Sequence, residues 1–146
     1  MNWQEYWVPY TITHVITFLL IFICYKWTKI GKVAWGIIFI LAGIFNIYTG
    51  ISNPQAYVAY GSHAIDLYQE FIYGLFSAYT SLIVSLIASG QILIGIFLFM
   101  KKPLFLLGIL GGIIFLVAIS PLGIGSAFPS TLLMSISLIL LYLRYK

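Results

Sequence analysis

Residues 33–52 read VAWGIIFILAGIFNIYTGIS, a run of twenty residues that contains no charged side chain. A hydrocarbon core about 30 Å thick requires roughly 17 to 25 helical residues per crossing. The run therefore predicts a transmembrane helix, and four further apolar runs of the same kind flank it. Together they predict an all-α, single-domain membrane bundle over residues 1–146, with five spans at residues 8–25, 33–52, 73–100, 103–120 and 126–143.

The composition also indicates a membrane protein. Hydrophobic residues make up 62% of the chain and charged residues 7%, and the mean hydropathy is +1.09. This leaves too little polar surface for a water-soluble domain. The net charge of +4 does not indicate nucleic acid, because the cations cluster beside the apolar runs. We therefore expect the lipid bilayer as a partner and exclude nucleic acid.

The distribution of charge predicts the topology. Basic residues occur in the first and third breaks between apolar runs and at the C-terminal end, whereas acidic residues precede the first run or lie in the second break. The basic residues are Lys26, Lys29, Lys32, Lys101, Lys102, Arg144 and Lys146, and the acidic ones are Glu5, Asp66 and Glu70. Because cations favour the cytoplasmic side, we expect an N-out, C-in protein of the prokaryotic cytoplasmic (inner) membrane.

The second break, residues 53–72, is too polar to cross a membrane and too apolar for an ordinary solvated loop. Asn53 followed by Pro54 is typical of a helix start. We expect an extracytoplasmic amphipathic helix here, which either lies along the membrane surface or extends the third span. Gly61 and Gly74 are the predicted bends.

Small residues predict how the helices pack. Gly36, Gly43 and Gly50 recur every seven residues in the second span, and serines recur every four residues in the third span, at Ser77, Ser81, Ser85 and Ser89. Such stripes let two helix backbones approach closely. We expect both stripes to mediate packing; a polar pathway is the alternative for the serines.

His63, Asp66 and Glu70 are spaced i, i+3 and i+7, so on one helix they would share a face, which Tyr73 continues. A histidine with two carboxylates can bind a divalent metal or carry a proton. The alternative is that these side chains form the water-facing side of the amphipathic helix.

Inside the spans, the polar inventory is short. His14 could carry a proton, bind the carbonyl of a quinone or, with His63, ligate haem. The buried amides are Asn46 and Gln91, which suit either interhelical hydrogen bonds or a ligand. The candidate ligand site, beneath the turn at residues 120–130, comprises His14, Asn46, Tyr57, Tyr60, His63, Asp66, Glu70, Tyr73 and Gln91.

Recognised catalytic motifs are absent from the sequence: it has no phosphate loop, no G-x-S-x-G turn and no H-E-x-x-H pair. Cys24 is the only cysteine, which excludes a C-x-x-C redox pair. A hydrolase or ion pump is therefore not expected. No cofactor is predicted outright; quinone, haem and a divalent metal are the alternatives considered.

Two stretches resemble the DoxX-like family of small prokaryotic membrane proteins. These are residues 36–46, GIIFILAGIFN, and residues 90–95, GQILIG, within a likeness that covers roughly residues 33–143. The resemblance implies a four-helix core with the first span added, and an accessory or quinone-associated role. It transfers no catalytic residue, because no catalytic motif of the family is matched here.

Two functional hypotheses follow; the first is non-enzymatic, and the sequence leaves open whether the protein is an enzyme, leaning against it. The first is an accessory or scaffold subunit that binds a membrane protein partner or forms a homo-oligomer. The second is a pocket in the outer leaflet for a small lipophile such as quinone, with a redox-accessory role. A transporter is the third alternative, since five spans form a small permeation unit unless the chain oligomerises.

Overall fold

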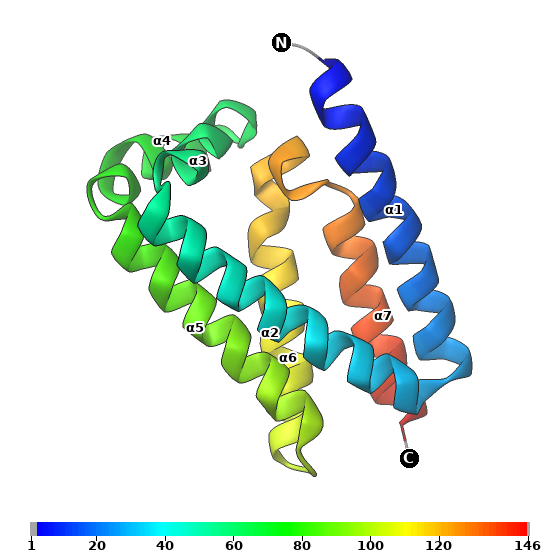
Figure 1. Cartoon of the computed structure of the whole chain (residues 1–146). Coiled ribbons are helices and arrows are strands. Elements are labelled where there is room, and N and C mark those ends of the chain that lie inside the picture. The colour runs from blue at the N-terminus through cyan, green and yellow to red at the C-terminus, as the bar shows by residue number, and fades with distance from the viewer. Residues whose placement is uncertain (1–2, 146) are drawn as a thin grey trace.

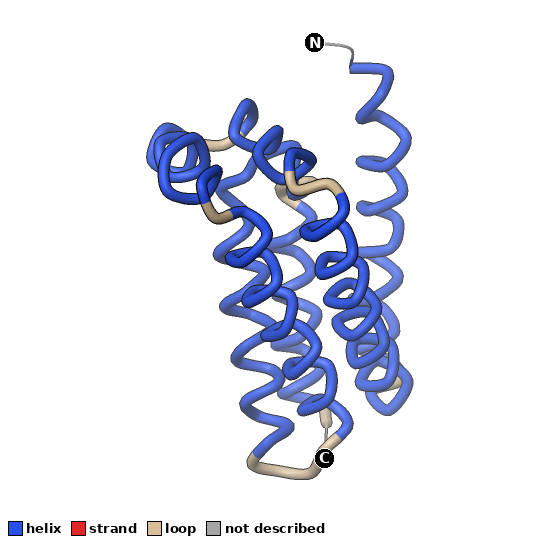
Figure 2. The backbone as a smooth tube through the Cα atoms, turned by 60° about the vertical axis from the view of Figure 1, so that its left-hand side comes forward, coloured by secondary structure: helices blue, strands red, loops and turns tan. Residues whose placement is uncertain are grey.

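The computed structural model describes the backbone of residues 3–145 and the side chains of residues 7–145. Regular structure in this range is entirely helical, which confirms the predicted all-α bundle (Figures 1 and 2). The side chain of Glu5 and the residue Lys146, which contributed to the charge argument, lie outside the described part. The five long helices are α1 (Trp3–Lys26), α2 (Thr28–Ser52), α5 (Thr80–Phe99), α6 (Leu104–Ile119) and α7 (Ser130–Arg144).

Four helical stretches are long and apolar enough to cross a membrane, namely Trp7–Lys26, Thr28–Ser52, Thr80–Phe99 and Leu104–Ser126. The fifth apolar helix, α7, has only 15 residues. These lengths and compositions are those of a multi-pass membrane protein.

Three predicted boundaries are wrong. The second helix begins at Thr28, so Lys29 and Lys32 belong to it. The third long helix begins at Thr80 instead of residue 73, because Gly74 (φ −93°, ψ −111°) and then Tyr79 (φ −129°, ψ 29°) are non-helical. The last helix begins at Ser130, because residues 120–126 form the 3₁₀ helix η3 and Ala127 then adopts a left-handed φ of 56°.

The single amphipathic helix expected over residues 53–72 is also wrong. The chain forms three short helices, α3 (Gln55–Val58), η1 (Ala59–His63) and α4 (Asp66–Phe71), followed by the π-helical turn η2 (Ile72–Phe76). The break falls at Ala64 and Ile65, whose ψ angles of 158° and 155° are extended. There the Ile65 amide donates to the Pro121 carbonyl at 3.1 Å, a partner that local sequence does not reveal.

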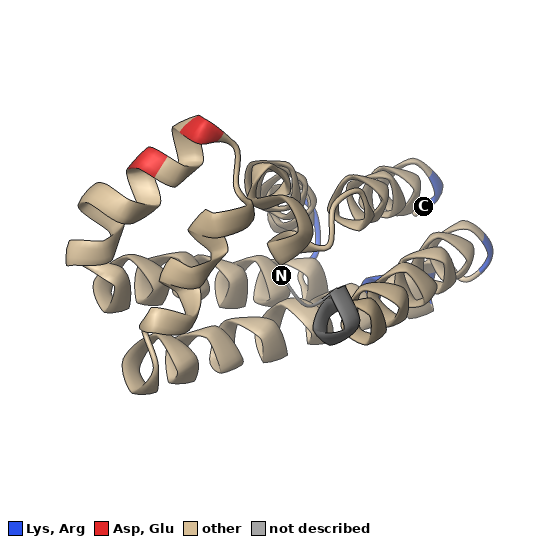
Figure 3. Cartoon of the chain, turned by 90° about the horizontal axis from the view of Figure 1, so that it is seen from above, with Lys and Arg blue, Asp and Glu red and all other residues tan. Residues whose placement is uncertain are grey.

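We call residues 53–79 the cap segment. The end of the bundle that carries the cap segment and η3 is the cap end, and the opposite end, with the α1–α2 and α5–α6 connections, is the turn end (Figure 1). The described cations all lie at the turn end: at the end of α1, the start of α2, the α5–α6 connection and the end of α7. The described acidic residues, Asp66 and Glu70, lie on α4, apart from the cations (Figure 3).

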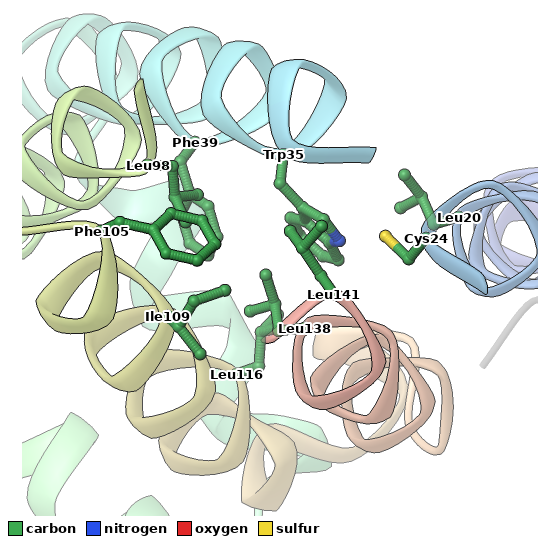
Figure 4. Packing of buried hydrophobic residues seen from close by; sticks show 10 residues of the cluster. All are labelled: Leu20, Cys24, Trp35, Phe39, Leu98, Phe105, Ile109, Leu116, Leu138 and Leu141. Carbon is green, nitrogen blue, oxygen red and sulfur yellow. The ribbon is translucent and has the colours of Figure 1, made fainter. Parts of the chain in front are cut away.

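The core lies towards the turn end, where side chains from all five long helices meet (Figure 4). Trp35 is only 1% exposed, and its indole nitrogen donates to the Ser137 hydroxyl of α7 at 3.0 Å. Phe39, Phe105 and Leu138 belong to the same buried cluster as Trp35. The buried cluster thus connects α2 with α6 and α7.

The predicted glycine stripe does mediate packing, between α2 and α5. A Cβ atom on Gly43 would lie 2.7 Å from the Ala88 carbonyl oxygen, and one on Gly95 would lie 2.7 Å from that of Gly36. Both are distances that real Cβ atoms essentially never show. We call this contact the glycine seam.

The serine stripe, in contrast, faces outward. Ser77, Ser81 and Ser89 are exposed, and Ser85 is half-buried. Ser77 and Ser89 satisfy their hydroxyls within their own chain segment by donating to backbone carbonyls three or four residues earlier. The stripe is therefore not buried against another helix of this chain, and its expected role in packing stays a prediction.

Candidate functional site

A cavity of about 440 Å³ lies between α5 and α6 at the cap end, beneath the cap segment and η3. Its volume falls within the range of about 300–1,000 Å³ typical of small-molecule sites. The walls combine aromatic and aliphatic side chains with a few polar ones. The lining residues are Asn46, Tyr57, Tyr60, Tyr68, Phe71, Ile72, Phe76, Val84, Ile87, Gln91, Phe115, Ala118, Ile119, Leu122, Gly125 and Ser126.

The cavity exists because α5 and α6 diverge from their connection towards the cap end (Figure 1). Near the turn end, glycines hold the two helices together: a Cβ atom on Gly108 would lie 2.9 Å from the Leu98 backbone nitrogen, and one on Gly111 would lie 2.9 Å from the Ile94 side chain. One turn further along α6, the bulkier Phe115 replaces glycine and lines the cavity.

Close contacts between η1 and η3 form the roof of the cavity. Gly123 has a φ of +63°, which favours glycine, and a Cβ atom there would lie 2.5 Å from the His63 carbonyl oxygen. Gly125 lies against the ring of Tyr60, and a Cβ atom there would approach it to 2.8 Å. Glycine at both positions therefore lets the two turns approach each other and cover the cavity.

A chain of hydrogen bonds lies along one wall. The Tyr57 hydroxyl donates to the Asn46 side-chain oxygen at 2.8 Å, and the Asn46 side-chain nitrogen donates to the Gln91 side-chain oxygen at 2.7 Å. The three residues come from α3, α2 and α5. They link the cap segment to the glycine seam's helices through side chains that also face the cavity.

Both N–H groups of the Gln91 side-chain amide lack an acceptor among the described residues. Gln91 is only 3% exposed, and within the described part of the chain its one hydrogen bond is the one that its oxygen accepts from Asn46. A buried amide of this kind normally has a partner for each polar atom. Because Gln91 lines the cavity, a bound molecule can supply the missing acceptor.

Burial raises the pKa of Tyr57 above its usual 10.0, and the neighbouring Tyr60 raises it further. The phenol therefore stays neutral at physiological pH and keeps its proton for the bond to Asn46. No charged residue is among those that line the cavity.

The structure brings together four of the nine sequence-predicted site residues. Asn46, Tyr57, Tyr60 and Gln91 line the cavity, and the predicted position beneath the turn at residues 120–130 matches its location under η3. The role of these side chains in binding a ligand stays a prediction.

The other five predicted residues lie elsewhere. His14 is on α1, where its Nδ1 donates to the Tyr10 carbonyl at 2.9 Å. Tyr73 is 51% exposed, with its ring against Gly61. The remaining three residues, His63, Asp66 and Glu70, belong to the cap segment but do not line the cavity.

The shared helix face proposed for His63, Asp66 and Glu70 does not exist. His63 ends η1, whereas Asp66 begins α4 after two extended residues. Within the described residues, no group of three His, Cys, Asp or Glu side chains is placed to hold a metal ion. The Nδ1 atom of His63 instead lies 2.9 Å from the Ser62 hydroxyl.

Sequence reasoning missed most of the apolar lining. Phe71, Phe115 and Ala118 resemble ordinary membrane-helix residues, and they line a site only because α5 and α6 diverge. The change along α6 from glycines at positions 108, 111 and 112 to Phe115 is the one signal that could have indicated this divergence.

Comparison with protein families, with curated proteins and with solved structures finds no match to this chain. The resemblance to the DoxX-like family therefore gains no support from these comparisons, and the functional argument depends on the cavity itself.

Proposed function

We propose that this protein holds an uncharged lipophilic small molecule in the cap-end cavity. The observation that carries the proposal is the Gln91 amide nitrogen, which belongs to a buried residue on the wall of an apolar cavity and has no acceptor among the described residues. A hydrogen-bond acceptor on the ligand would satisfy this donor, and the aromatic and aliphatic walls would bury the rest of the molecule.

The lining favours an uncharged ligand. Among residues 7–145, no Lys, Arg, His, Asp or Glu lines the cavity, so an ion would be desolvated without a compensating partner. A neutral molecule that carries a carbonyl, ester or ether oxygen avoids this cost. Quinone belongs to this class, as do many other lipophiles, and the lining does not single one out.

We further propose five crossings, by α1, α2, α5, α6 and α7, with the cap end outside the cytoplasm of a prokaryotic cell. Support comes from the separation of the described cations at the turn end from Asp66 and Glu70 at the cap end. Cysteine labelling decides this point: Asp66→Cys should react with an impermeant reagent from outside, and Lys101→Cys should not. The reverse pattern would invert the orientation.

The ligand proposal is tested by filling the cavity. We expect Ala118→Trp to abolish retention of any organic molecule that copurifies with the wild-type protein in native nanodiscs, as measured by mass spectrometry of a solvent extract. Val117→Trp is the matched control, since Val117 is a neighbour on α6 that is 47% exposed and does not line the cavity. An extract of the wild-type protein that contains only bulk membrane lipids in bulk proportions would contradict the proposal.

A second candidate function is that of an accessory subunit which assembles with another copy or another membrane protein. The outward serine stripe favours it, because small polar residues on an exposed membrane helix suit contact with a further helix. Ser89→Cys should form a disulfide-linked dimer on mild oxidation in membranes, and Ile114→Cys, on the exposed side of α6 away from the stripe, serves as the control. Cys24 is fully buried and does not interfere. A DoxX-like kinship would suit either role and stays a proposal.

A further inference from the structure

We infer that the ligand is an amphiphile. It enters the cavity from the membrane through a lateral opening between α5 and α6, the mouth, and its own polar end enters first. This inference rests on the proposed ligand-binding function and specifies the ligand class and its orientation. It follows from the opposite chemistry of the two ends of the cavity.

The inner end of the cavity is polar and donates hydrogen bonds. The Asn46 oxygen accepts from Tyr57, and one N–H of Asn46 donates to Gln91. The donors left over on this wall, among the described residues, are therefore the second N–H of Asn46 and both N–H groups of the Gln91 amide. An acceptor oxygen on the ligand is the complementary group. A ligand whose polar end carries only donors would leave the Gln91 amide nitrogen unpaired.

The mouth of the cavity is apolar. Residues that both line the cavity and are exposed on the protein surface mark the opening, and these include Phe71 at 45% exposure, Ile87 at 47% and the exposed Ala118. They come from α4, α5 and α6. Tyr60 is also exposed, at 36%, but its ring is seated against Gly125 in the roof. The opening towards the side of the bundle is therefore bounded by hydrocarbon.

The depth of Gln91 agrees with this direction of entry. Gln91 follows the start of α5 at Thr80 by eleven residues, which corresponds to about 16 Å along the axis at ~1.5 Å per residue. Ile87, at the mouth, lies one turn nearer the cap end. A molecule that enters beside Ile87 thus reaches the Gln91 amide only with its leading end, and its tail remains among Phe71, Ile87 and the surrounding lipid.

One hydrogen bond spans the mouth. The Tyr68 hydroxyl of α4 donates to the Ala118 carbonyl of α6 at 2.8 Å. This bond holds α4 beside α6 and sets the width of the opening.

The test uses the full-length protein in nanodiscs and a long-chain 2-alkanone, a ketone-headed lipophile, as the probe. Two versions carry a photoreactive diazirine, one beside the carbonyl and one at the far end of the chain. We expect the head-labelled version to crosslink to α2 around Asn46 or to Gln91, and the tail-labelled version to crosslink to Phe71 or to lipid. Gln91→Met should lower labelling by the head version about fivefold to tenfold, as loss of one net hydrogen bond implies.

Competition separates the polar contact from simple partitioning. Unlabelled 2-alkanone should suppress crosslinking, whereas an n-alkane of equal length should do so only weakly, because it offers no acceptor. Tyr68→Phe should speed the onset of labelling without shifting the crosslinked residues.

The possible outcomes separate the orientation of the ligand from the binding function and from the role of the Gln91 amide. A reversed pattern, with the tail at Asn46 and the head at Phe71, or equal labelling by both versions at both places, overturns the head-first orientation and leaves the proposed binding function standing. Labelling of cavity residues that is no higher than in Ala118→Trp, for both versions, contradicts the binding function as well. Oriented labelling that persists unchanged in Gln91→Met would overturn the role assigned to the amide.

Discussion

The two ends of the α5–α6 hairpin are built from different residues, and only one of them is closed. Near the turn end, Gly108 and Gly111 bring α6 against α5, and on the other side of α5 the glycine seam holds α2 equally close. At the cap end, bulkier side chains of both helices, namely Val84, Ile87, Phe115 and Ile119, line a cavity of about 440 Å³.

The difference teaches where a membrane bundle can hold a ligand. Lipid tails are as apolar as the helices, so close packing between helices depends on small residues that let backbones meet. Where bulky side chains replace the glycines, the helices separate, and the space between them is available to a lipophile. The glycine seam holds α2 and α5 firmly together, so α5 stays in place while α6 separates from it at the cap end.

The largest effect is expected from breaking the glycine seam. Gly95→Ala places a Cβ atom 2.7 Å from the Gly36 carbonyl oxygen, and overpacking of this kind costs about 1–3 kcal/mol or more. Gly90→Ala is the matched control on the same helix, because nothing lies within 4 Å of its added Cβ atom. Unfolding in mixed micelles of increasing denaturing detergent measures both. Equal destabilisation by the two variants would show that the seam is not tight.

The next largest effect is expected at the Trp35–Ser137 contact near the turn end. Trp35→Phe removes a buried hydrogen bond and leaves a small void, which together should cost about 1–3 kcal/mol. Ser137→Ala should lower the free energy of unfolding of the wild-type protein by less than Trp35→Phe does. In the Trp35→Phe background, the same substitution should lower it only slightly. The same unfolding assay, applied as a double-mutant cycle, checks the coupling; additive losses would contradict the hydrogen bond.

At the open end, added bulk should be tolerated. Ala118→Trp inserts a large side chain beside a cavity instead of against a neighbouring backbone, so we expect a change in unfolding free energy below about 1 kcal/mol. Its value should lie close to that of Val117→Trp in the same assay. Destabilisation as large as that of Gly95→Ala would mean that the cap end is packed as tightly as the seam.

The smallest effect concerns pH. Because burial raises the pKa of Tyr57 in the folded protein above 10.0, the neutral phenol contributes stability that is fully present below pH 10.0 and is lost as pH rises through the folded-state pKa. Difference titration of tyrosinate absorbance between the wild type and Tyr57→Phe should show one phenol that ionises later than a free tyrosine. A curve centred at or below 10.0 would contradict this.

Much of the bundle could be predicted from local patterns. Uninterrupted apolar runs suffice to predict the long helices, because a helix satisfies all backbone groups within one segment. The spacing of Gly36, Gly43 and Gly50 indicated a tight interface, and Gly74 indicated a bend. Each of these is information carried within one helix or one turn.

The rest depends on contacts between distant segments. The prediction that residues 53–72 form one helix is wrong because the Ile65 amide donates to the Pro121 carbonyl. The shared helix face on which the metal hypothesis depended is therefore absent from the described residues. Asn46 and Gln91 were recognisable as buried amides, but their mutual bond and their place on a cavity wall follow from the seam's register and the divergence of α6. Nor does the spacing of the serines tell which side of α5 they occupy.

The shortness of α7 has a consequence for the surrounding bilayer. Its 15 residues extend about 22 Å at ~1.5 Å per residue, against a hydrocarbon thickness of roughly 30 Å. Under the proposed five crossings, lipid beside α7 must thin, or the uncharged turn before the helix must enter the hydrocarbon region, and either adjustment costs free energy through hydrophobic mismatch. The protein should accordingly be most stable in short-chain lipids and should concentrate in the thinner regions of a membrane.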